Sequence, residues 1–252
     1  MNGNNGNKQS SMKEERFFYA PDAAVSDELP EEEAQHALRV LRLDAGDEMM
    51  LMDGKGTFYH AVITEATKKR CFYRIDETLP QERPWKGYLH LAMAPTKNMD
   101  RVEWLAEKAT EIGFDELTFL NCQFSERRIV KTERVEKILI SAMKQSRKAW
   151  KPMLNGMTDF KDFVKRDYSG GKYICHCYGD DNVVKLGEKL LLRDVLKAGE
   201  DALVMVGPEG DFSVEEVAEA ERCGFQSVSL GDSRLRTETA AFVAVHLMNL
   251  FN

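Results

Sequence analysis

Two polar turns near the C-terminus carry the residues whose types and spacing best suit chemistry. The first has the sequence Gly-Pro-Glu-Gly at residues 207–210, and the second spans residues 230–241 and includes Arg234 and Arg236. Glycines let the backbone approach a ligand, and a guanidinium can hold an anionic group or lower the pKa of a weakly acidic N–H. Taken alone, each turn could equally well have a purely structural role. In the second turn, Arg236 and Glu238 would then only stabilise the turn by pairing with each other.

The two turns occupy equivalent places in the chain, each between an apolar strand pattern and a helix pattern. Strand-to-helix turns lie at the carboxyl edge of an α/β sheet, where ligands usually bind. Ser213 and Glu216 follow the first turn in the spacing of a capping box, and a helix begins near Thr239 after the second. Because about one strand-helix unit separates them, we expect both turns to line one pocket between neighbouring strands.

Several other kinds of site are disfavoured by the sequence. It has neither a Gly-Lys-Ser/Thr phosphate loop nor the G-x-G-x-x-G dinucleotide fingerprint. Cys175-His176-Cys177 resembles a fragment of a metal site, but no second cluster would complete four ligands. We therefore expect no metal. The five scattered cysteines suggest a reducing cytoplasm rather than a disulfide framework.

Length and charge bound the organisation of the chain. Its 252 residues suffice for one large domain or two modest ones, and no apolar run approaches the roughly 20 residues that span a membrane. Residues 1–15 lack a signal sequence and are expected to form a disordered leader. The net charge is −7, yet residues 121–151 hold nine basic and three acidic residues. This segment is either an anion-binding surface or a solvated helix face.

The chain divides into two regions by pattern. Residues 16–80 show strand patterns at 49–52, 57–63 and 71–75 and a helix at 31–41, which predicts a small, mostly β domain, a barrel or half-barrel. Pro80 and Pro84 mark a linker. From residue 88, strands and helices alternate, which predicts an α/β fold with a mostly parallel sheet covered on both faces. Its first helix is expected to begin at Asp100, with Glu103 completing a capping box.

Short motifs in a fixed order link the sequence to a known family. The strongest combines the turn at 207–210 and residues 230–231 with the run Leu-Arg-Thr-Glu-Thr-Ala at 235–240. The others are Arg16-Phe17-Phe18, His36 with Val40, Leu41 and Arg42, Lys97 with the helix at 103–113, Ser125-Glu126-Arg127 with Lys131, and Gln145-Ser146-Arg147. Together they cover residues 16–251 and resemble the RsmE family, the 16S ribosomal RNA uridine N3-methyltransferases of the SPOUT superfamily.

The resemblance implies a fold, a cofactor and partners. It implies a PUA-like β-barrel domain at residues 16–80 that holds RNA, and a SPOUT domain at residues 88–252 with a deep C-terminal trefoil knot. The implied cofactor is S-adenosylmethionine. The implied partners are the 16S ribosomal RNA of the small ribosomal subunit and a second copy of the chain in a homodimer, in the cytoplasm and without a membrane.

The implied cofactor site uses both turns. Backbone groups near residues 206–207 and 230–231 are expected to hydrogen-bond the adenine and ribose, while Leu235 and Ala240 pack against the purine. The full set of candidate cofactor-binding residues is Val206, Gly207, Pro208, Glu209, Gly210, Leu230, Gly231, Leu235, Thr237 and Ala240.

Catalysis and RNA binding are assigned to charged residues. Uridine N3 must lose a proton, so Arg236 is expected to stabilise the enolate-like oxygen that develops, and Glu238 is a candidate general base. For His36, packing as a half-buried histidine is the alternative to an RNA contact. The candidate RNA-binding residues are Arg16, His36, Arg39, Arg42, Lys97, Arg127, Lys131 and Arg147.

The sequence departs from the family pattern at four positions, which are Lys144, Asp211, Ser233 and Arg234. Asp211 stands where a second glycine is usual. The departures at Ser233 and Lys144 leave an alternative open, namely a ribosomal RNA-binding assembly factor without methyltransferase activity. A nucleotide-dependent hydrolase or reductase is a weaker alternative, because the chain lacks a phosphate loop, a Ser-His pair and metal ligands.

Overall fold

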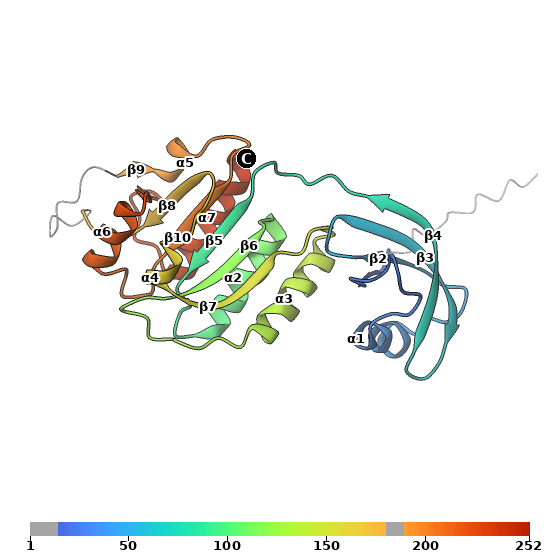
Figure 1. Cartoon of the computed structure of the whole chain (residues 1–252). Helices are drawn as coiled ribbons and strands as arrows, with labels where there is room; N and C mark the ends of the chain where they lie inside the picture. Colours follow the sequence, from blue (N-terminus) through green and yellow to red (C-terminus); the bar gives the residue numbers. More distant parts are fainter. Residues whose placement is uncertain (1–14, 180–188) are drawn as a thin grey trace, which may run out of the picture. The chain divides into compact units, whose positions relative to one another are not determined.

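A computed structural model describes residues 15–179 and 189–252, which form two compact units (Figure 1). Among the described residues, the first unit comprises 15–53 and Thr57–Pro80, and the second comprises Gly54–Gly56, 81–179 and 189–252. All but one residue of the predicted leader lies outside the described residues.

The first unit is built on a four-stranded sheet in the order β1-β2-β3-β4. β1 pairs in parallel with β2, while β2, β3 and β4 are antiparallel, so the predicted strand-turn-strand at residues 49–63 is confirmed as a hairpin. The helix α1 continues into a π-helical segment, η1. The bounds are β1 Phe17–Tyr19, α1 Glu31–Gln35, η1 His36–Val40, β2 Glu48–Met52, β3 Thr57–Ala66 and β4 Cys71–Pro80.

The core of the first unit lies between this sheet and its helix. Phe18, Leu51 and Ile63 are buried on the sheet and pack with Ala34 and Ala37 from the helical segment. The strand order is linear, and the described residues contain no ladder between β1 and β4 that would close a barrel. The helical segment, rather than a closing ladder, covers the apolar face.

The second unit contains a seven-stranded, fully parallel sheet in the order β7-β6-β5-β10-β8-β11-β9 (Figure 1). The strands are β5 Leu89–Met93, β6 Glu116–Asn121, β7 Met153–Asp159, β8 Gly171–Cys175, β9 Leu190–Leu191, β10 Ala202–Val206 and β11 Gln226–Ser229. The helices are α2 Met99–Ile112, α3 Thr132–Gln145, α4 Phe160–Phe163, α5 Leu192–Val195, α6 Val214–Arg222 and α7 Thr237–Phe251. The predicted α/β fold with a parallel sheet is therefore confirmed.

Both faces of this sheet are buried, which explains why its central strands are apolar throughout. Successive side chains of a strand point to opposite faces. Thus Val204 packs into one core cluster with residues of α2, α3 and α7, whereas Leu203 and Met205 pack into another with residues of α4 and α6. Because the helices are split between the faces, the carboxyl edge of the sheet remains open to the loops.

The helix starts agree with the sequence in one case and differ in another. The capping box that opens α6 is confirmed, since Ser213 Oγ accepts from the Glu216 N–H at 3.2 Å and Glu216 Oε2 accepts from the Ser213 N–H at 2.9 Å. The expected cap at Asp100 is wrong, because α2 is capped by Asn98, whose Oδ1 accepts from the Asp100 N–H at 3.0 Å. Glu103 instead forms an ion pair with Arg134.

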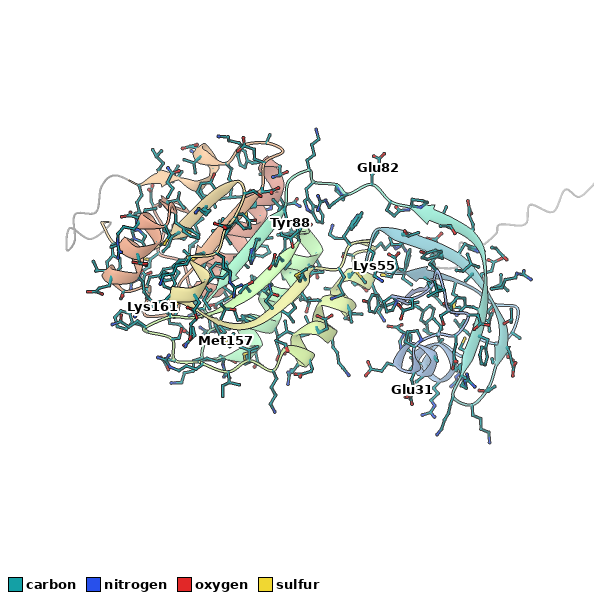
Figure 2. The ribbon with its side chains drawn as sticks, in the orientation of Figure 1. Glu31, Lys55, Glu82, Tyr88, Met157 and Lys161 are labelled. Atoms are coloured by element: carbon teal, nitrogen blue, oxygen red, sulfur yellow. The ribbon has the colours of Figure 1, made fainter. Side chains whose placement is uncertain are left out.

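A buried histidine of β5 lies in a polar cluster. His90 is 5% exposed, and its Nε2 lies 2.8 Å from Thr118 Oγ1 and 3.6 Å from Glu116 Oε1. Tyr88, labelled in Figure 2, donates to the other oxygen of Glu116 at 2.9 Å. Burial lowers the pKa of His90 to about 4, and it outweighs the opposite effect of Glu116. His90 is therefore neutral in the native protein at neutral pH.

This histidine predicts a loss of stability in acid. The pKa of His90 is lower in the folded chain than in the unfolded chain, so its contribution is complete above pH 6.5 and lost as pH falls toward about 4. We expect the stability difference between wild type and His90→Gln to change by about 2–3 kcal/mol between pH 7.5 and 4.5. Urea unfolding followed by tryptophan fluorescence measures it, because all three tryptophans lie in the second unit. Parallel pH profiles for the two proteins would contradict the assignment.

Candidate functional site

A cavity of about 610 Å³ opens at the carboxyl edge of the parallel sheet and is lined by both polar turns. Gly207 and Leu235, which lie 28 positions apart in the sequence, both line it. All ten candidate cofactor-binding residues line this cavity, together with Arg236. The structure thus brings together the residues of the two turns that the sequence placed in one pocket.

The strand order differs from the expectation in one respect that matters for the site. The turns follow β10 and β11, which are not neighbours, because β8 lies between them. The residues after β8 therefore also line the cavity, with Cys175, His176 and Cys177 all contributing. The prediction of two adjacent strands is wrong, and the inserted strand supplies a wall of the cavity that sequence reasoning missed.

The first turn is held in shape by its own aspartate. The Asp211 N–H donates to the Pro208 carbonyl at 2.9 Å, and Asp211 has a φ of 66°, in the left-handed region that usually favours glycine. Its carboxylate accepts from the Cys177 N–H and from the Phe212 N–H, each at 2.8 Å. Asp211 lacks the conformational freedom of the glycine that is usual at this position, but its carboxylate forms two hydrogen bonds that a glycine could not form.

Gly207 lies where the first turn packs most closely. A Cβ atom at this position would lie 3.0 Å from both Phe212 Cδ2 and the Phe212 backbone nitrogen. Contacts this short are tighter than most Cβ contacts in proteins, so a side chain here requires Phe212 to move by a few tenths of an ångström. The buried glycine thus fixes the path of the backbone along the cavity wall.

The second turn leads directly into the N-terminus of α7. Ser229 Oγ lies 3.2 Å from the Gly231 nitrogen that donates to it, and Gly231 has a φ of 126°. Arg236 is the N-cap residue of α7, and its carbonyl accepts the first helical bond, from the Ala240 N–H at 2.8 Å. The first N–H groups of a helix have no partner within it, so this end of α7 offers donors beside the cavity.

Three guanidinium groups line the cavity, on Arg101, Arg234 and Arg236. Arg101 lies in the first turn of α2, after β5, and its Nε is 3.6 Å from Glu238 Oε1. Glu238 does not line the cavity and is only 7% exposed, and its Oε2 has no hydrogen-bond partner among the described residues. The sequence analysis did not predict Arg101 as a site residue. The signal it missed is that Arg101 lies in the first turn of a helix that directly follows a strand, which is where the two polar turns were also found.

The cysteine and histidine in the wall are not set up for covalent or metal chemistry. Cys177 is exposed, yet partial desolvation, reinforced by the Asp211 carboxylate, raises the pKa of its thiol, and a thiol is a much weaker nucleophile than a thiolate. His176 Nε2 lies 2.9 Å from Ser227 Oγ. Within residues 15–179 and 189–252, no three or more Cys, His, Asp or Glu side chains are arranged to hold a metal ion. The cavity instead offers guanidinium groups, backbone donors and an apolar wall.

The candidate RNA-binding residues fall into two groups. Arg16, His36, Arg39 and Arg42 of the first unit are exposed, and so are Lys131 and Arg147 of the second. The half-buried alternative for His36 is wrong, although its ring contacts the edge of Phe18. Lys97 is also exposed and forms an ion pair with Glu126, while Arg127 is half-buried and donates to the backbone carbonyls of Thr96 and Lys97.

Part of the basic excess at residues 121–151 is balanced within the protein. Arg134 pairs with Glu103, and Lys151 pairs with Glu136. The basic surface available to a partner is therefore smaller than the composition suggested. No helix in the parts of the chain that the structure describes is long and apolar enough to cross a membrane.

Comparisons with known proteins agree with this geometry. A family model described as an RNA methyltransferase domain matches residues 83–249, and one described as an RNA methyltransferase PUA domain matches residues 29–76. The chain is 30% identical over 241 residues to a ribosomal RNA small subunit methyltransferase E from Synechocystis sp., covering 93% of this chain and 77% of that protein. A Rickettsia conorii protein of the same description is 28% identical, with 84% of each chain covered.

Two solved structures are similar over nearly the whole chain. A probable rRNA-methyltransferase from Porphyromonas gingivalis has 42% identity and a TM-score of 0.87, covering 94% of this chain and 98% of that one. A ribosomal RNA small subunit methyltransferase E from Neisseria gonorrhoeae bound to S-adenosyl methionine has 26% identity and a TM-score of 0.80, covering 94% and 97%.

Proposed function

The chain belongs to the ribosomal RNA small subunit methyltransferase E family of RNA methyltransferases, and we propose that it methylates N3 of one uridine in 16S ribosomal RNA. It is an S-adenosylmethionine-dependent ribosomal RNA methyltransferase. The observation that carries the proposal for the reacting site is the single cavity that joins the glycine turn to the arginine turn.

The residues present fit S-adenosylmethionine. Val206, Leu230, Leu235 and Ala240 give the cavity apolar walls suited to an adenine, and the volume of about 610 Å³ lies in the range of small-molecule sites. Backbone groups of both turns and the first N–H groups of α7 supply hydrogen-bonding partners. When bound, this cofactor supplies an electrophilic methyl group, so the protein has mainly to position and tune the acceptor.

Arg236 is the residue we assign to the acceptor base. Methylation at N3 requires the uracil ring to lose a proton, which passes to solvent water, and negative charge then spreads to the neighbouring carbonyl oxygens. A fixed guanidinium in the cavity favours that anion and so promotes proton loss without being a base itself. Arg236 lines the cavity beside the start of α7, which adds a positive helix dipole on the same side.

Glu238 serves the same site in our proposal, but by a different route from that expected. Its carboxylate lies behind the cavity wall and faces Arg101, so we assign it to orienting the Arg101 guanidinium rather than to accepting the uridine proton. A buried carboxylate oxygen without a partner costs stability, which is consistent with a functional constraint at Glu238. Arg101 then joins Arg236 as a second cation that faces the substrate.

RNA phosphates are assigned to the exposed basic residues of both units. In the second unit these are Lys131 and Arg147, and in the first they are Arg16, His36, Arg39 and Arg42. Each phosphate contact releases counterions, so we expect Lys131→Ala and Arg147→Ala each to flatten the plot of log K against log salt by about 0.7–0.9. Filter binding of the target RNA at several salt concentrations measures this. Lys197→Ala, which removes an exposed lysine beside Glu200, is the control; equal slopes in all variants would reject the assignment.

We also propose a homodimer, formed through α2 and α7. These helices pack against each other and expose aromatic surface, with Trp104 43% and Phe251 40% exposed. The Trp104 ring lies 5.5 Å from Phe242. Exposed apolar patches of this kind often mark an interface. Sedimentation equilibrium of the full chain should give twice the 28.7 kDa of one copy.

The finer features of the fold are proposals of the same kind. We propose a trefoil knot in the SPOUT domain at residues 88–252, preceded by a PUA-like RNA-binding domain at residues 16–80, and a cytoplasmic location. After β11, which lies toward one edge of the sheet, the chain returns to its middle, where α7 packs against β5 and β10. A trefoil knot requires the C-terminal segment to pass back through an earlier loop of the chain, and this return to the middle of the sheet is compatible with such a path. The ranges 29–76 and 83–249 of the two family models support the domain limits.

The experiment that tests the proposed function is mass spectrometry of 16S ribosomal RNA from a strain that lacks the gene. We expect one 3-methyluridine to disappear and to return when the gene is restored. An unchanged set of methyluridines would argue for the alternative, an assembly factor without methyltransferase activity. The cavity argues against that alternative, since both turns that would hold S-adenosylmethionine line it.

A further inference from the structure

We propose that Arg127 is a positioning residue for the methyl-donor turn at residues 207–211, acting through the loop at residues 94–98, and not a ligand of an RNA phosphate. This inference rests on the proposed function, because it assigns the turn to S-adenosylmethionine. Three loops carry it. They follow β5, β6 and β10, which are neighbours in the sheet, so the loops meet at its carboxyl edge.

The guanidinium of Arg127 is directed at backbone carbonyls of the β5 loop. Its Nε donates to the Thr96 carbonyl at 3.1 Å and to the Lys97 carbonyl at 3.2 Å, and its Nη2 also donates to the Lys97 carbonyl. Thr96 is fully buried. Two of the guanidinium nitrogens of Arg127 therefore hold a loop of the same chain. The planar guanidinium allows both nitrogens to donate to neighbouring carbonyls at once.

The β5 loop in turn holds the methyl-donor turn. The Lys97 N–H donates to Glu209 Oε1 at 2.9 Å, and the Ala94 N–H donates to the Val206 carbonyl at 3.0 Å. The Lys97 ammonium, which was a candidate RNA ligand, lies 2.8 Å from Glu126 Oε2. Arg127, the β5 loop and Glu209 thus form a continuous chain of hydrogen bonds that ends in the turn.

Arg127's own loop also touches the turn directly. A Cβ atom at Gly210 would lie 3.1 Å from Phe124 Cβ, so the turn packs closely against the β6 loop. On its other side the turn is held by the bond from the Cys177 N–H to Asp211. The turn is therefore held by the β5 and β6 loops on one side and by the β8 loop on the other. Arg127 holds the β5 loop in place for its contacts with the turn.

This role and a phosphate-binding role predict opposite results for two substitutions. Arg127→Lys keeps the positive charge but cannot donate to both carbonyls in one plane, so a positioning role is lost whereas a phosphate contact is largely kept. Arg127→Ala removes both. If Arg127 positions the turn, each variant weakens binding of S-adenosylmethionine when no RNA is present, and the salt dependence of RNA binding keeps its wild-type slope.

The test is calorimetric titration of the full chain with S-adenosylmethionine, alongside RNA binding at several salt concentrations. We expect the Kd for S-adenosylmethionine to rise about tenfold in both Arg127→Lys and Arg127→Ala, the size expected for lost charge-assisted hydrogen bonds. Arg128→Ala is the matched control, because Arg128 donates to the Asn121 side chain at 2.7 Å and not to the β5 loop. Its Kd should stay within about twofold of wild type.

The inference is overturned if both Arg127 variants bind S-adenosylmethionine as wild type does, or if Arg127→Lys alone does. If Arg127→Ala flattens the plot of log K for RNA against log salt but leaves the Kd for S-adenosylmethionine unchanged, Arg127 binds an RNA phosphate instead. If Arg127→Ala does not fold, Arg127→Lys decides the question alone. Failure of the wild-type chain to bind S-adenosylmethionine is a different result, since it removes the proposed function on which the inference rests.

Discussion

Replacing Arg236 with alanine should lower kcat for methylation about 100- to 1000-fold, the usual cost of removing one group that stabilises a developing oxyanion. The Kd for S-adenosylmethionine should stay within about twofold, because the guanidinium acts on the uracil oxygen and not on the cofactor. Single-turnover methylation of the target RNA, together with calorimetric titration of the cofactor, separates the two effects. The activity of the variant should also rise with pH, since free uridine loses its N3 proton more readily in base.

Two further substitutions show whether position matters or only charge. Arg236→Lys retains a cation but not the planar fork, so we expect it to recover only part of the lost rate. Arg234→Ala removes a guanidinium that also lines the cavity, two residues earlier in the same turn. A loss of rate as large as that of Arg236→Ala would mean that the turn contributes a diffuse positive charge. Near-normal methylation by Arg236→Ala with intact cofactor binding would remove Arg236 from the mechanism.

The second large effect is expected at Gly207. A valine there would place its Cβ 3.0 Å from both Phe212 Cδ2 and the Phe212 nitrogen, so the side chain and backbone of Phe212 must shift and the turn is overpacked. Overpacking of this kind costs about 1–3 kcal/mol, which corresponds to a rise of about 5- to 150-fold in the Kd for S-adenosylmethionine if the moved turn is the binding element. Calorimetric titration measures this directly, and thermal unfolding shows whether the fold survives.

Gly156→Ala serves as the control for this substitution. Gly156 lies in β7, outside the residues that line the cavity, and the nearest atom to a Cβ there would be Thr132 Cγ2 at 4.0 Å. Its affinity for S-adenosylmethionine should match that of wild type. If Gly207→Val also binds with wild-type affinity while remaining folded, the first turn is not part of the cofactor site.

The parts of the fold that the sequence predicted well are those set by local pattern. The apolar run of β10, which is buried on both faces, and the Ser213–Glu216 capping box that opens α6 are examples. The hairpin of β2 and β3 followed from two apolar runs flanking a glycine turn. In each case neighbouring residues alone decide the conformation, so no knowledge of distant contacts was needed.

The features that the sequence did not reveal depend either on contacts between segments that are distant in the sequence or on a choice between two residues that suit the same position equally well. β7 was missed because it is an edge strand with a mostly half-exposed or exposed pattern and a glycine at its centre. The insertion of β8 between β10 and β11 is a matter of strand order, which no local pattern encodes. At the start of α2, Asn98 and Asp100 are both good capping residues, and only the fold shows that Asn98 caps.

The same distinction applies to the site. The two turns were found because glycine, proline and arginine at strand-to-helix junctions have a direct physical meaning. Arg101 and the bond between Asp211 and the Cys177 N–H were not found, because each joins segments that meet only across the sheet edge. Lys97 and Arg127 were predicted to bind RNA from charge and motif alone, and their hydrogen-bond partners became visible only in three dimensions.

The most direct test of the central claim is methylation in vitro of small ribosomal subunits from a strain that lacks the gene, with S-adenosylmethionine labelled in its methyl group. The RNA is then digested and the labelled nucleoside is identified by mass spectrometry. We predict that the wild-type chain adds one label per 16S ribosomal RNA, on N3 of a single uridine, and that Arg236→Ala adds almost none. Label on carbon 5 or on a ribose hydroxyl, or no label with the wild-type chain, would contradict the account.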